Sequence, residues 1–377
     1  DNNIMNIDKS VDKEADGGIV SPTAIVLWGD GEPLDNTAYI EKLSSLSRRS
    51  PIAQDNYSIG GSVAELEEYM AGMLGKESAV FMPTGTLANH IAVRKLCQGY
   101  SRVIVQEQGH IYRDSGDTVQ QLSGINLLPL GVGSPCFTYE EVQQAIEDSL
   151  NGRVRTRVGA LVVESPVRRC HGQVMPFREM QRITQLCQEN SIGTHLDGAR
   201  LFMMSAASGI NPEQYSSLFN TVYVSMWKYF GSPFGAILAG TNEFCENLYE
   251  QRRKFGGSLP SASMAAALAL EGSKSFQKDF DDAMKKGMEL LSRLSETPEV
   301  QWEPYPNGSN IFPVSFSSSV DIGILSSALE KRGIFINHET DGINRIYVTA
   351  NVTLLRKPVD QILHDFGKAL EESVASN

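Results

Sequence analysis

The chain has 377 residues, of which 41% are hydrophobic and 21% charged, and its formal net charge is −12. This length and composition suit a large globular domain together with a smaller one. The acidic charge argues against nucleic acid or an anionic membrane as the main partner, and no apolar run approaches the ~20 residues that span a bilayer.

The cysteines and histidines do not form the patterns of a disulfide framework or a metal site. The five cysteines are scattered, without a CxxC motif, which favours a reducing compartment, the cytoplasm. The six histidines form no ligand-spaced cluster. The chain does not begin with Met, so a removed leader and export remain open.

The sequence predicts a flexible N-terminal arm followed by a large and a small domain. Residues 1–20 are polar and acidic and lack helical or strand periodicity. We expect a large domain over residues 21–260 and a small one over residues 261–377. One or two helices over residues 261–294 would make the crossing between them.

The first strong pattern in the large domain is a helix, a strand, a Gly/Thr turn and a second helix. Val63–Leu74 has helical spacing, and Gly75 is a stop signal. A buried strand, Ala79–Met82, leads into Thr84-Gly85-Thr86 and the second helix. Free N–H groups at the start of that helix, with the threonine hydroxyls, would bind a phosphate. Taken alone, the turn is more simply a helix N-cap.

Further along the chain, buried strands alternate with helices. Strands are predicted at Arg102–Gln106 and Val158–Glu164, and helices at Thr138–Leu150 and Phe177–Asn190. This alternation predicts an α/β fold with a doubly wound, mostly parallel sheet. His110 follows the first of these strands, and from its position alone it is a core, capping or functional residue.

Two later apolar runs end in ionisable residues. The first ends at Asp197, and the second, Thr221–Met226, is followed by Lys228. Both residues would lie at the carboxyl edge of the sheet, where open α/β folds bind ligands. A lysine that forms a Schiff base and a carboxylate that protonates a pyridine ring are the pair required by pyridoxal phosphate chemistry.

Each of these two residues also has a simpler interpretation. An Asp followed by Gly is common in turns and helix caps. A Lys at a strand end is usually solvated. The bulky neighbours Trp227, Tyr229 and Phe230 favour the cofactor interpretation, because desolvation disfavours the ammonium form.

Three motifs resemble a known family: His195-Leu196-Asp197-Gly198-Ala199-Arg200, Val224-Ser225-Met226-Trp227-Lys228 with the glycine-rich turn after it, and Ala236-Ile237-Leu238-Ala239-Gly240. From about Tyr57 to Gly257 the chain resembles the threonine aldolase / aromatic amino acid β-eliminating lyase family. That family belongs to the fold type I pyridoxal phosphate enzymes. The resemblance implies pyridoxal 5′-phosphate as cofactor, a small amino-acid substrate and a homodimer or homotetramer.

The resemblance also implies a role for each candidate residue. Lys228 would carry the internal aldimine, Asp197 would pair with the pyridine nitrogen, and His110 would stack on the ring. The other cofactor-binding residues would be Thr84, Gly85, Thr86, Arg200 and Ser225, and the substrate-binding residues Arg345, Arg200 and Glu164. Arg345 would hold the α-carboxylate in its planar fork, although by position alone it is equally a surface arginine.

The chain departs from the family around the substrate and the phosphate. Family threonine aldolases have Glu-Asn-Thr-His where this chain has Glu164-Ser165-Pro166-Val167, and Val167 cannot act as a base for the β-hydroxyl proton. A family serine is Gly29 here, a glutamate is Ser115, and Met-Arg-Gln is replaced by Ser258-Leu259-Pro260. These changes predict weak cleavage of L-threonine.

The C-terminal part, from Val300 to Ser376, mixes strands with helices and predicts a small α+β domain. For the whole chain we predict a pyridoxal phosphate-dependent lyase that cleaves the Cα–Cβ bond of an amino acid or eliminates at Cβ. An aminotransferase, a racemase or a side-chain transfer enzyme is the alternative within the same chemistry. A non-catalytic binding protein on the same fold is a second alternative.

Overall fold

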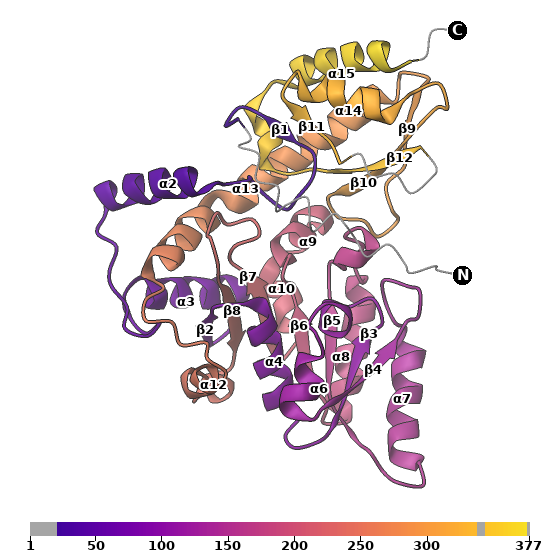
Figure 1. Cartoon of the computed structure of the whole chain (residues 1–377). Helices are drawn as coiled ribbons and strands as arrows, with labels where there is room; N and C mark the ends of the chain where they lie inside the picture. Colours follow the sequence, from indigo (N-terminus) through magenta and orange to yellow (C-terminus); the bar gives the residue numbers. More distant parts are fainter. Residues whose placement is uncertain (1–20, 338–343, 375–377) are drawn as a thin grey trace. The chain divides into compact units, whose positions relative to one another are not determined.

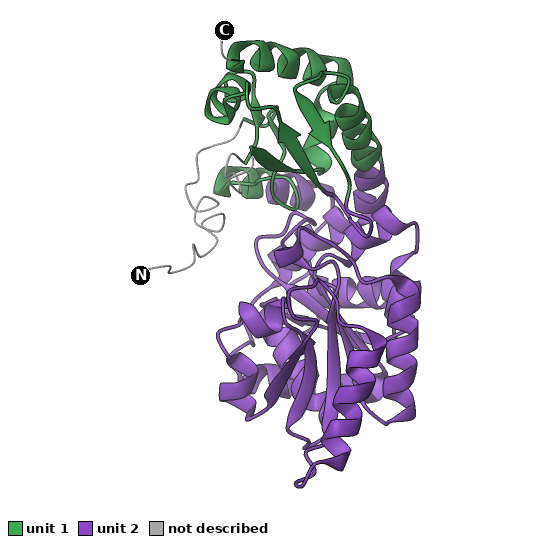
Figure 2. Ribbon diagram, turned by 90° about the vertical axis from the view of Figure 1, so that its right-hand side faces the viewer, with its two compact units in different colours: residues 1–41, 282–304, 312–377 green, residues 42–281, 305–311 purple. Residues whose placement is uncertain are grey.

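The computed structural model describes residues 21–337 and 344–374 (Figure 1), and the predicted arm over residues 1–20 lies outside them. The described chain divides into two compact units (Figure 2). The larger unit comprises Lys42–Asp281 and Tyr305–Ile311, and the smaller unit contains the remaining described residues. None of the described helices is long and apolar enough to cross a membrane.

The division into units differs from the predicted domains, 21–260 and 261–377, at both ends of the larger unit. The segment around β1 (Ile25–Val26) belongs to the smaller unit, where it pairs with β11 (Ile334–Phe335). The helix α13 (Ser263–Leu294) continues from the larger unit into the smaller one. A strand pairing between segments so far apart in the sequence leaves no local signal.

The larger unit is built on a seven-stranded sheet with the order β2-β8-β7-β6-β5-β3-β4 (Figure 1). β8 is antiparallel to both of its neighbours, whereas the pairs from β7 to β4 are parallel. The predicted mostly parallel α/β fold is therefore confirmed. The strands are β2 (Ser78–Met82), β3 (Arg102–Gln106), β4 (Asn126–Leu130), β5 (Val158–Glu164), β6 (Gly193–Asp197), β7 (Thr221–Ser225) and β8 (Ala236–Gly240).

Helices cover both faces of this sheet (Figure 1). α4 and α6 lie on one face and α8 on the other, as right-handed crossovers between parallel strands require. The helices wholly inside this unit are α3 (Gly61–Leu74), α4 (Gly85–Leu96), α5 (His110–Arg113), α6 (Thr118–Ser123), α7 (Tyr139–Asn151), α8 (Phe177–Glu189), α9 (Leu201–Ser208), α10 (Pro212–Ser217), α11 (Asn242–Cys245) and α12 (Leu248–Lys254). Both α2 (Asn36–Arg49) and α13 contain residues of the two units.

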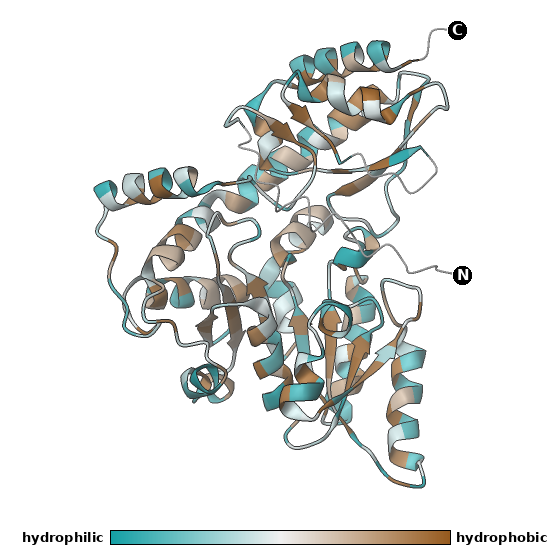
Figure 3. Ribbon diagram, viewed as in Figure 1, coloured by the Kyte–Doolittle hydropathy of each residue, from teal (hydrophilic) through white to brown (hydrophobic). Residues whose placement is uncertain are grey.

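Most residues of β5, β7 and β8 are hydrophobic, as expected for strands that helices cover on both sides (Figure 3). Every residue of β5, β7 and β8 is buried. Local signals fix most element ends: Gly75, in the left-handed conformation at φ 61°, ends α3 as predicted. The sequence analysis missed β4, which contains Pro129. A proline is tolerated there because β4 is an edge strand.

The smaller unit is the predicted α+β arrangement. A three-stranded sheet has the order β12-β10-β9, and β9 and β10 are antiparallel. Two helices, α14 and α15, pack against each other. The elements are β9 (Val300–Trp302), β10 (Ile311–Phe316), α14 (Ile322–Glu330), β12 (Arg345–Thr349) and α15 (Val359–Ser373).

One close backbone contact in the larger unit supports the segment after β7. α13 passes Phe230 at Gly272, where an added Cβ would lie 1.9 Å from the Phe230 carbonyl oxygen. The Ser232 hydroxyl donates a hydrogen bond to the Ala265 carbonyl of the same helix at 2.9 Å. Since Lys228 lies two residues before Phe230, α13 holds the chain that carries the candidate lysine.

We predict that Gly272→Ala destabilises the protein by at least ~1 kcal/mol. The steric clash of the added methyl group with Phe230 should outweigh the higher helix propensity of alanine. The matched control is Gly72→Ala in α3, where no atom lies within 4 Å of the added Cβ. The control should stabilise the protein by roughly 0.5–1 kcal/mol. Urea unfolding of both variants checks the prediction, which fails if Gly272→Ala is as stable as Gly72→Ala.

Candidate active site

The carboxyl ends of β2, β3, β5, β6 and β7 lie along one edge of the central sheet, because these strands run in the same direction. Each of these five strands brings at least one predicted site residue to this edge. Examples are Gly85 after β2, His110 after β3, Glu164 at the end of β5, Asp197 at the end of β6 and Lys228 after β7.

Asp197 is buried and its carboxylate is held by two donors. Its side chain is 3% exposed. The Asn89 side-chain amide donates to Oδ2 at 2.8 Å, and the Ala199 backbone N–H donates to Oδ1 at 3.2 Å. A buried charge needs such partners, since desolvation otherwise disfavours it. The carboxylate therefore has a fixed orientation.

A buried chain of hydrogen bonds fixes Asn89 in turn. Since its amide donates to Asp197, its oxygen accepts a hydrogen bond from Nε2 of His195 at 2.9 Å. Burial lowers the pKa of His195 to about 4, so the ring is neutral, and its Nδ1 accepts from the Thr221 hydroxyl at 2.7 Å. The sequence analysis gave no role to Asn89 or His195. The available signal was that Asn89 lies one helical turn after Gly85.

His110 lies within electrostatic reach of the other candidates. Burial lowers the pKa of its imidazole, the charge of Asp197 raises it, and the charge of Lys228 lowers it. The charges of Asp114 and Arg200 act on it more weakly. The ring is one-third exposed, so a bound molecule can reach it.

Both carboxylate oxygens of Glu164 accept hydrogen bonds from backbone N–H groups. Its Oε2 accepts the His110 N–H at 2.5 Å, and its Oε1 accepts the Arg168 N–H at 3.1 Å. Burial and the neighbouring charge of Asp197, its register partner on β6, raise the pKa of Glu164 well above the usual range. This carboxyl group therefore clamps His110 and the loop after β5 together.

The turn after β2 leaves room for only a glycine. A Cβ on Gly85 would lie 2.0 Å from the hydroxyl oxygen of Tyr223, a buried residue of β7. Thr84 is the N-cap of α4, with its Oγ1 accepting the Leu87 N–H at 3.1 Å. The cap leaves the Thr84 hydroxyl hydrogen available as a donor, and Thr86 is half-buried in the first turn. The geometry fits both the capping and the phosphate interpretations.

Lys228 is half-buried at the same edge. Its backbone N–H donates to the Ser225 hydroxyl at 3.4 Å, which places Ser225 beneath the turn. Its ammonium lies 5.4 Å from the centre of the Trp227 ring. Tyr229 and Phe230 are buried, as expected for bulky flanks, whereas Trp227 is 48% exposed.

The two predicted carboxylate-binding arginines lie in different units. Arg200 follows Asp197, is half-buried, and its charge acts on His110 and Glu164. Arg345 begins β12 of the smaller unit, and its Nε donates to the Ser315 hydroxyl at 3.3 Å. Arg345 therefore stays a prediction from the sequence.

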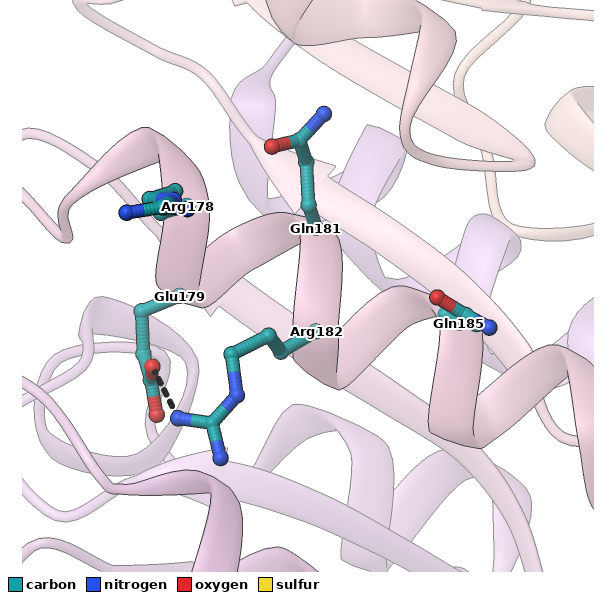
Figure 4. A pocket seen from close by; sticks show the side chains of 5 residues that line it. All are labelled: Arg178, Glu179, Gln181, Arg182 and Gln185. Carbon is teal, nitrogen blue, oxygen red and sulfur yellow. Dashed lines mark hydrogen bonds and ion pairs between the residues drawn. The ribbon is translucent and has the colours of Figure 1, made fainter.

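A surface depression of about 570 Å³ lies elsewhere, on the helix α8 (Figure 4). All five lining residues come from that single helix, and none is a predicted site residue. They are Arg178, Glu179, Gln181, Arg182 and Gln185. Arg182 donates to Glu179 at 2.9 Å, so the two opposite charges are paired with each other. We assign no function to this depression.

A family model described as "Beta-eliminating lyase" matches residues 37–313, well over half of the chain. The match contains all the predicted site residues of the larger unit. The chain belongs to the beta-eliminating lyase family. This membership confirms the family, the fold class and the pyridoxal phosphate cofactor that the sequence predicts.

Among beta-eliminating lyase family members, the chain is similar to low-specificity L-threonine aldolases of Candida albicans and Saccharomyces cerevisiae. The first is 28% identical over 216 residues, 57% of each chain. The second is 28% identical over 241 residues, 63% of this chain and 61% of the relative. The chain thus spans about three-fifths of the length of these curated relatives.

A solved structure extends the likeness over nearly the whole fold. It is a Listeria monocytogenes protein described as a "putative L-allo-threonine aldolase", with a TM-score of 0.78 and 26% identity. The alignment covers 92% of this chain and 95% of that chain. Its agreement in fold supports the seven-stranded sheet and the crossover pattern described above.

Val167 and His171, at which the sequence predicts a departure from the family's motif, have defined contacts. Val167 is fully buried, and its N–H donates to the Gln173 carbonyl at 2.8 Å. The ring of His171 stacks on Tyr305 with centroids 6.0 Å apart. The departure itself stays a prediction from the sequence.

The segment Ser258-Leu259-Pro260 supports a neighbouring loop. The Leu259 carbonyl accepts the Ser58 hydroxyl at 3.3 Å, and the Pro260 carbonyl accepts the Tyr57 N–H at 3.1 Å. Tyr57 and Ser58 both have positive φ, at 52° and 61°, which is uncommon for residues other than glycine. Such a conformation persists only where the surroundings fix it.

Arg252 is the main support of this loop, and the sequence analysis missed it. It is fully buried, and its guanidinium donates to the carbonyls of Phe81 at 2.6 Å, Tyr57 at 3.0 Å and Ser58 at 3.3 Å. Glu67 of α3 acts on Arg252 electrostatically and accepts the Tyr249 hydroxyl at 2.8 Å. Burial raises the pKa of Glu67 to about 7.

This raised pKa predicts a pH-dependent effect of Glu67→Gln. Above pH 7 the folded protein holds a buried charge, which costs stability; between about pH 7 and pH 4.5 the folded state takes up a proton and the cost disappears. Glu67→Gln should therefore be more stable than wild type at pH 8, by up to about 3 kcal/mol, and equally stable near pH 4.5.

Urea unfolding at pH 8 and at about pH 4.5 measures this difference. Glu68→Gln is the control, because Glu68 is exposed on the same helix. The control should differ little from wild type at either pH. A Glu67→Gln effect of equal size at both pH values would show that the charge is not responsible.

Proposed function

We propose that this protein is a pyridoxal phosphate-dependent lyase that cleaves the Cα–Cβ bond of an amino acid or eliminates at Cβ. The observation that carries the proposal is the position of Asp197, Lys228, His110 and the Gly85 turn at one edge of the sheet. Family membership supports the same reaction class.

The residues at this edge fit the cofactor. Gly85 begins α4, and the backbone N–H groups of that first turn are suited to bind a phosphate. Asp197 offers a buried, oriented carboxylate to a protonated ring nitrogen. When bound, pyridoxal phosphate supplies an aldehyde for attachment to lysine and a ring that accepts electrons from the substrate.

We assign the remaining steps to the chain's own side chains. Lys228 holds the cofactor and moves the proton at Cα, and Ser225 fixes the turn beneath it. His110 covers the ring face, and Glu164 holds His110 in place through its backbone N–H. Thr84 and Thr86 add hydroxyl donors to the phosphate, and Arg200 and Arg345 bind the substrate carboxylate.

A panel of L- and D-amino acids distinguishes the two reaction types. Cleavage at Cα–Cβ of a β-hydroxy amino acid releases glycine and an aldehyde. Elimination at Cβ releases the β-substituent together with an oxo acid and ammonia. Product analysis with the cofactor spectrum identifies the reaction. No change in spectrum or product with any amino acid would favour a non-catalytic binding protein.

We predict that borohydride reduction of the loaded protein fixes the cofactor mass on the peptide containing Lys228, and that Lys228→Ala abolishes this label while the protein stays folded. The reason is that Lys228 lies half-buried at the edge that also holds Asp197. Peptide mass spectrometry makes the measurement. Label on any other lysine contradicts the assignment.

We predict that L-threonine cleavage is at least ~10-fold less efficient than in family members that carry the histidine, because a positioned base typically contributes ~10²–10⁴-fold. Val167 occupies that place and is buried, and His171 is stacked on Tyr305. A steady-state assay for glycine and acetaldehyde checks this. An efficiency equal to that of ordinary threonine aldolases would refute it.

We also propose that the protein is a cytoplasmic homodimer or homotetramer whose site is completed by a neighbouring subunit. The loop from Tyr57 to Gly61 supports this, because Tyr57 and Ile59 are 46% and 48% exposed on backbone that Arg252 holds rigidly. Light scattering at micromolar concentration should give at least a dimer. A monomer with full cofactor occupancy would contradict the proposal.

A further inference from the structure

An acidic residue without an assigned role lies beside His110, and an arginine is paired with that acidic residue. Asp114 is four residues after His110, and its Oδ2 lies 3.7 Å from Nδ1 of the imidazole. The other oxygen of Asp114 accepts a hydrogen bond from Nη1 of Arg169 at 2.8 Å. The three side chains therefore form a row: imidazole, carboxylate, guanidinium.

The backbone of His110 is fixed independently of this row. Its N–H donates to Glu164, and its carbonyl accepts the Asp114 N–H at 2.8 Å and the Ser115 hydroxyl at 3.2 Å. These bonds hold the main chain but leave the ring free to choose which nitrogen carries hydrogen. Asp114 is the acidic group that lies against one of those nitrogens.

We propose that Asp114, held by Arg169, is a positioning residue that keeps the hydrogen of His110 on Nδ1 and leaves Nε2 as the acceptor nitrogen. A neutral imidazole has one donor and one acceptor nitrogen, and a carboxylate beside Nδ1 selects Nδ1–H. Arg169 fixes the carboxylate and withdraws part of its charge. The functional meaning of the acceptor nitrogen rests on the proposed function, whereas the row itself does not.

Asp114 and Arg169 are neighbours in the sequence of the residues at which we predict a departure from the family. Arg169 lies in the short turn Arg168–Cys170 that follows Val167, the residue that replaces the family's histidine. Ser115, which replaces a family glutamate, follows Asp114 directly. The segments that lost the family's polar groups thus supply the two groups that orient His110. In this chain His110 becomes the histidine with an available acceptor nitrogen at the sheet edge.

Several charges face His110 and must be separated in any test. Asp197 of β6 and Asp114 favour its protonated form, whereas Lys228 and Arg200 disfavour it. Glu164 contacts its backbone N–H, and Arg169 acts mainly through Asp114. Substitutions of Asp114 and Arg169 leave the other charges in place, so they report on the row alone.

The test is NMR titration of isotope-labelled histidine in the full chain without added cofactor, with His110→Gln to assign the signal. Asp114→Asn should lower the pKa of His110 by at least ~0.5 units, because a charge at about 4 Å is lost. It should also mix the two tautomers at high pH. Arg169→Gln should raise the pKa of His110, because the carboxylate regains its full charge.

The pKa of His110 should therefore shift in opposite directions in Asp114→Asn and Arg169→Gln. A merely structural role of the two residues would not give this result. Arg168→Gln removes the same charge from the adjacent residue and should shift the pKa by less than half as much as Arg169→Gln. Arg169 is 39% exposed, so its variant should fold even if Asp114→Asn does not. Shifts of the same sign, or an unchanged tautomer in a folded Asp114→Asn protein, would overturn the proposal. Because the measurement needs no cofactor, it does not depend on the Lys228 labelling result.

Discussion

The hydrogen bond from Asn89 to Asp197 is the interaction on which the arrangement of the sheet edge depends. The Asp197 side chain is 3% exposed, so this donor stands in for water that the carboxylate loses on folding. Asn89 is fixed by His195, and His195 by Thr221, so α4, β6 and β7 are joined by one buried polar chain. The same helix α4 begins at Gly85. The groups suited to the ring nitrogen and to the phosphate are therefore positioned by one element.

A second constraint comes from two carboxyl groups on neighbouring strands. Glu164 and Asp197 are register partners, and two buried negative charges so close together are unfavourable. The structure directs Glu164 to backbone N–H groups, where it joins His110 to the loop after β5. The sequence assigned Glu164 to the substrate. Its two backbone contacts support a different role, as the anchor of the histidine.

Of the four residues best suited to the cofactor, only Asp197 lies within a strand, as the last residue of β6. Gly85, His110 and Lys228 follow β2, β3 and β7, and Val167 lies on the equivalent connection after β5. Connections on a rigid scaffold commonly carry the functional side chains. The sheet therefore sets where these side chains meet, and the connections decide which side chains are presented there.

The sequence by itself determined most strands of the central sheet, the α/β class and the strand-end residues, because continuous apolar runs, glycine stops and caps are local signals. Helix α3 and strands β3 and β5 agree closely with their predicted ranges. Only the tertiary structure decided the pairing of β1 with β11, the three carbonyl contacts of Arg252, and the approach of Asp114 and Arg169 to His110. Some of these contacts join segments that are far apart in the sequence, and others depend on the direction in which a side chain points. The periodicity of hydrophobic residues along the chain contains no information on long-range pairing or on side-chain direction.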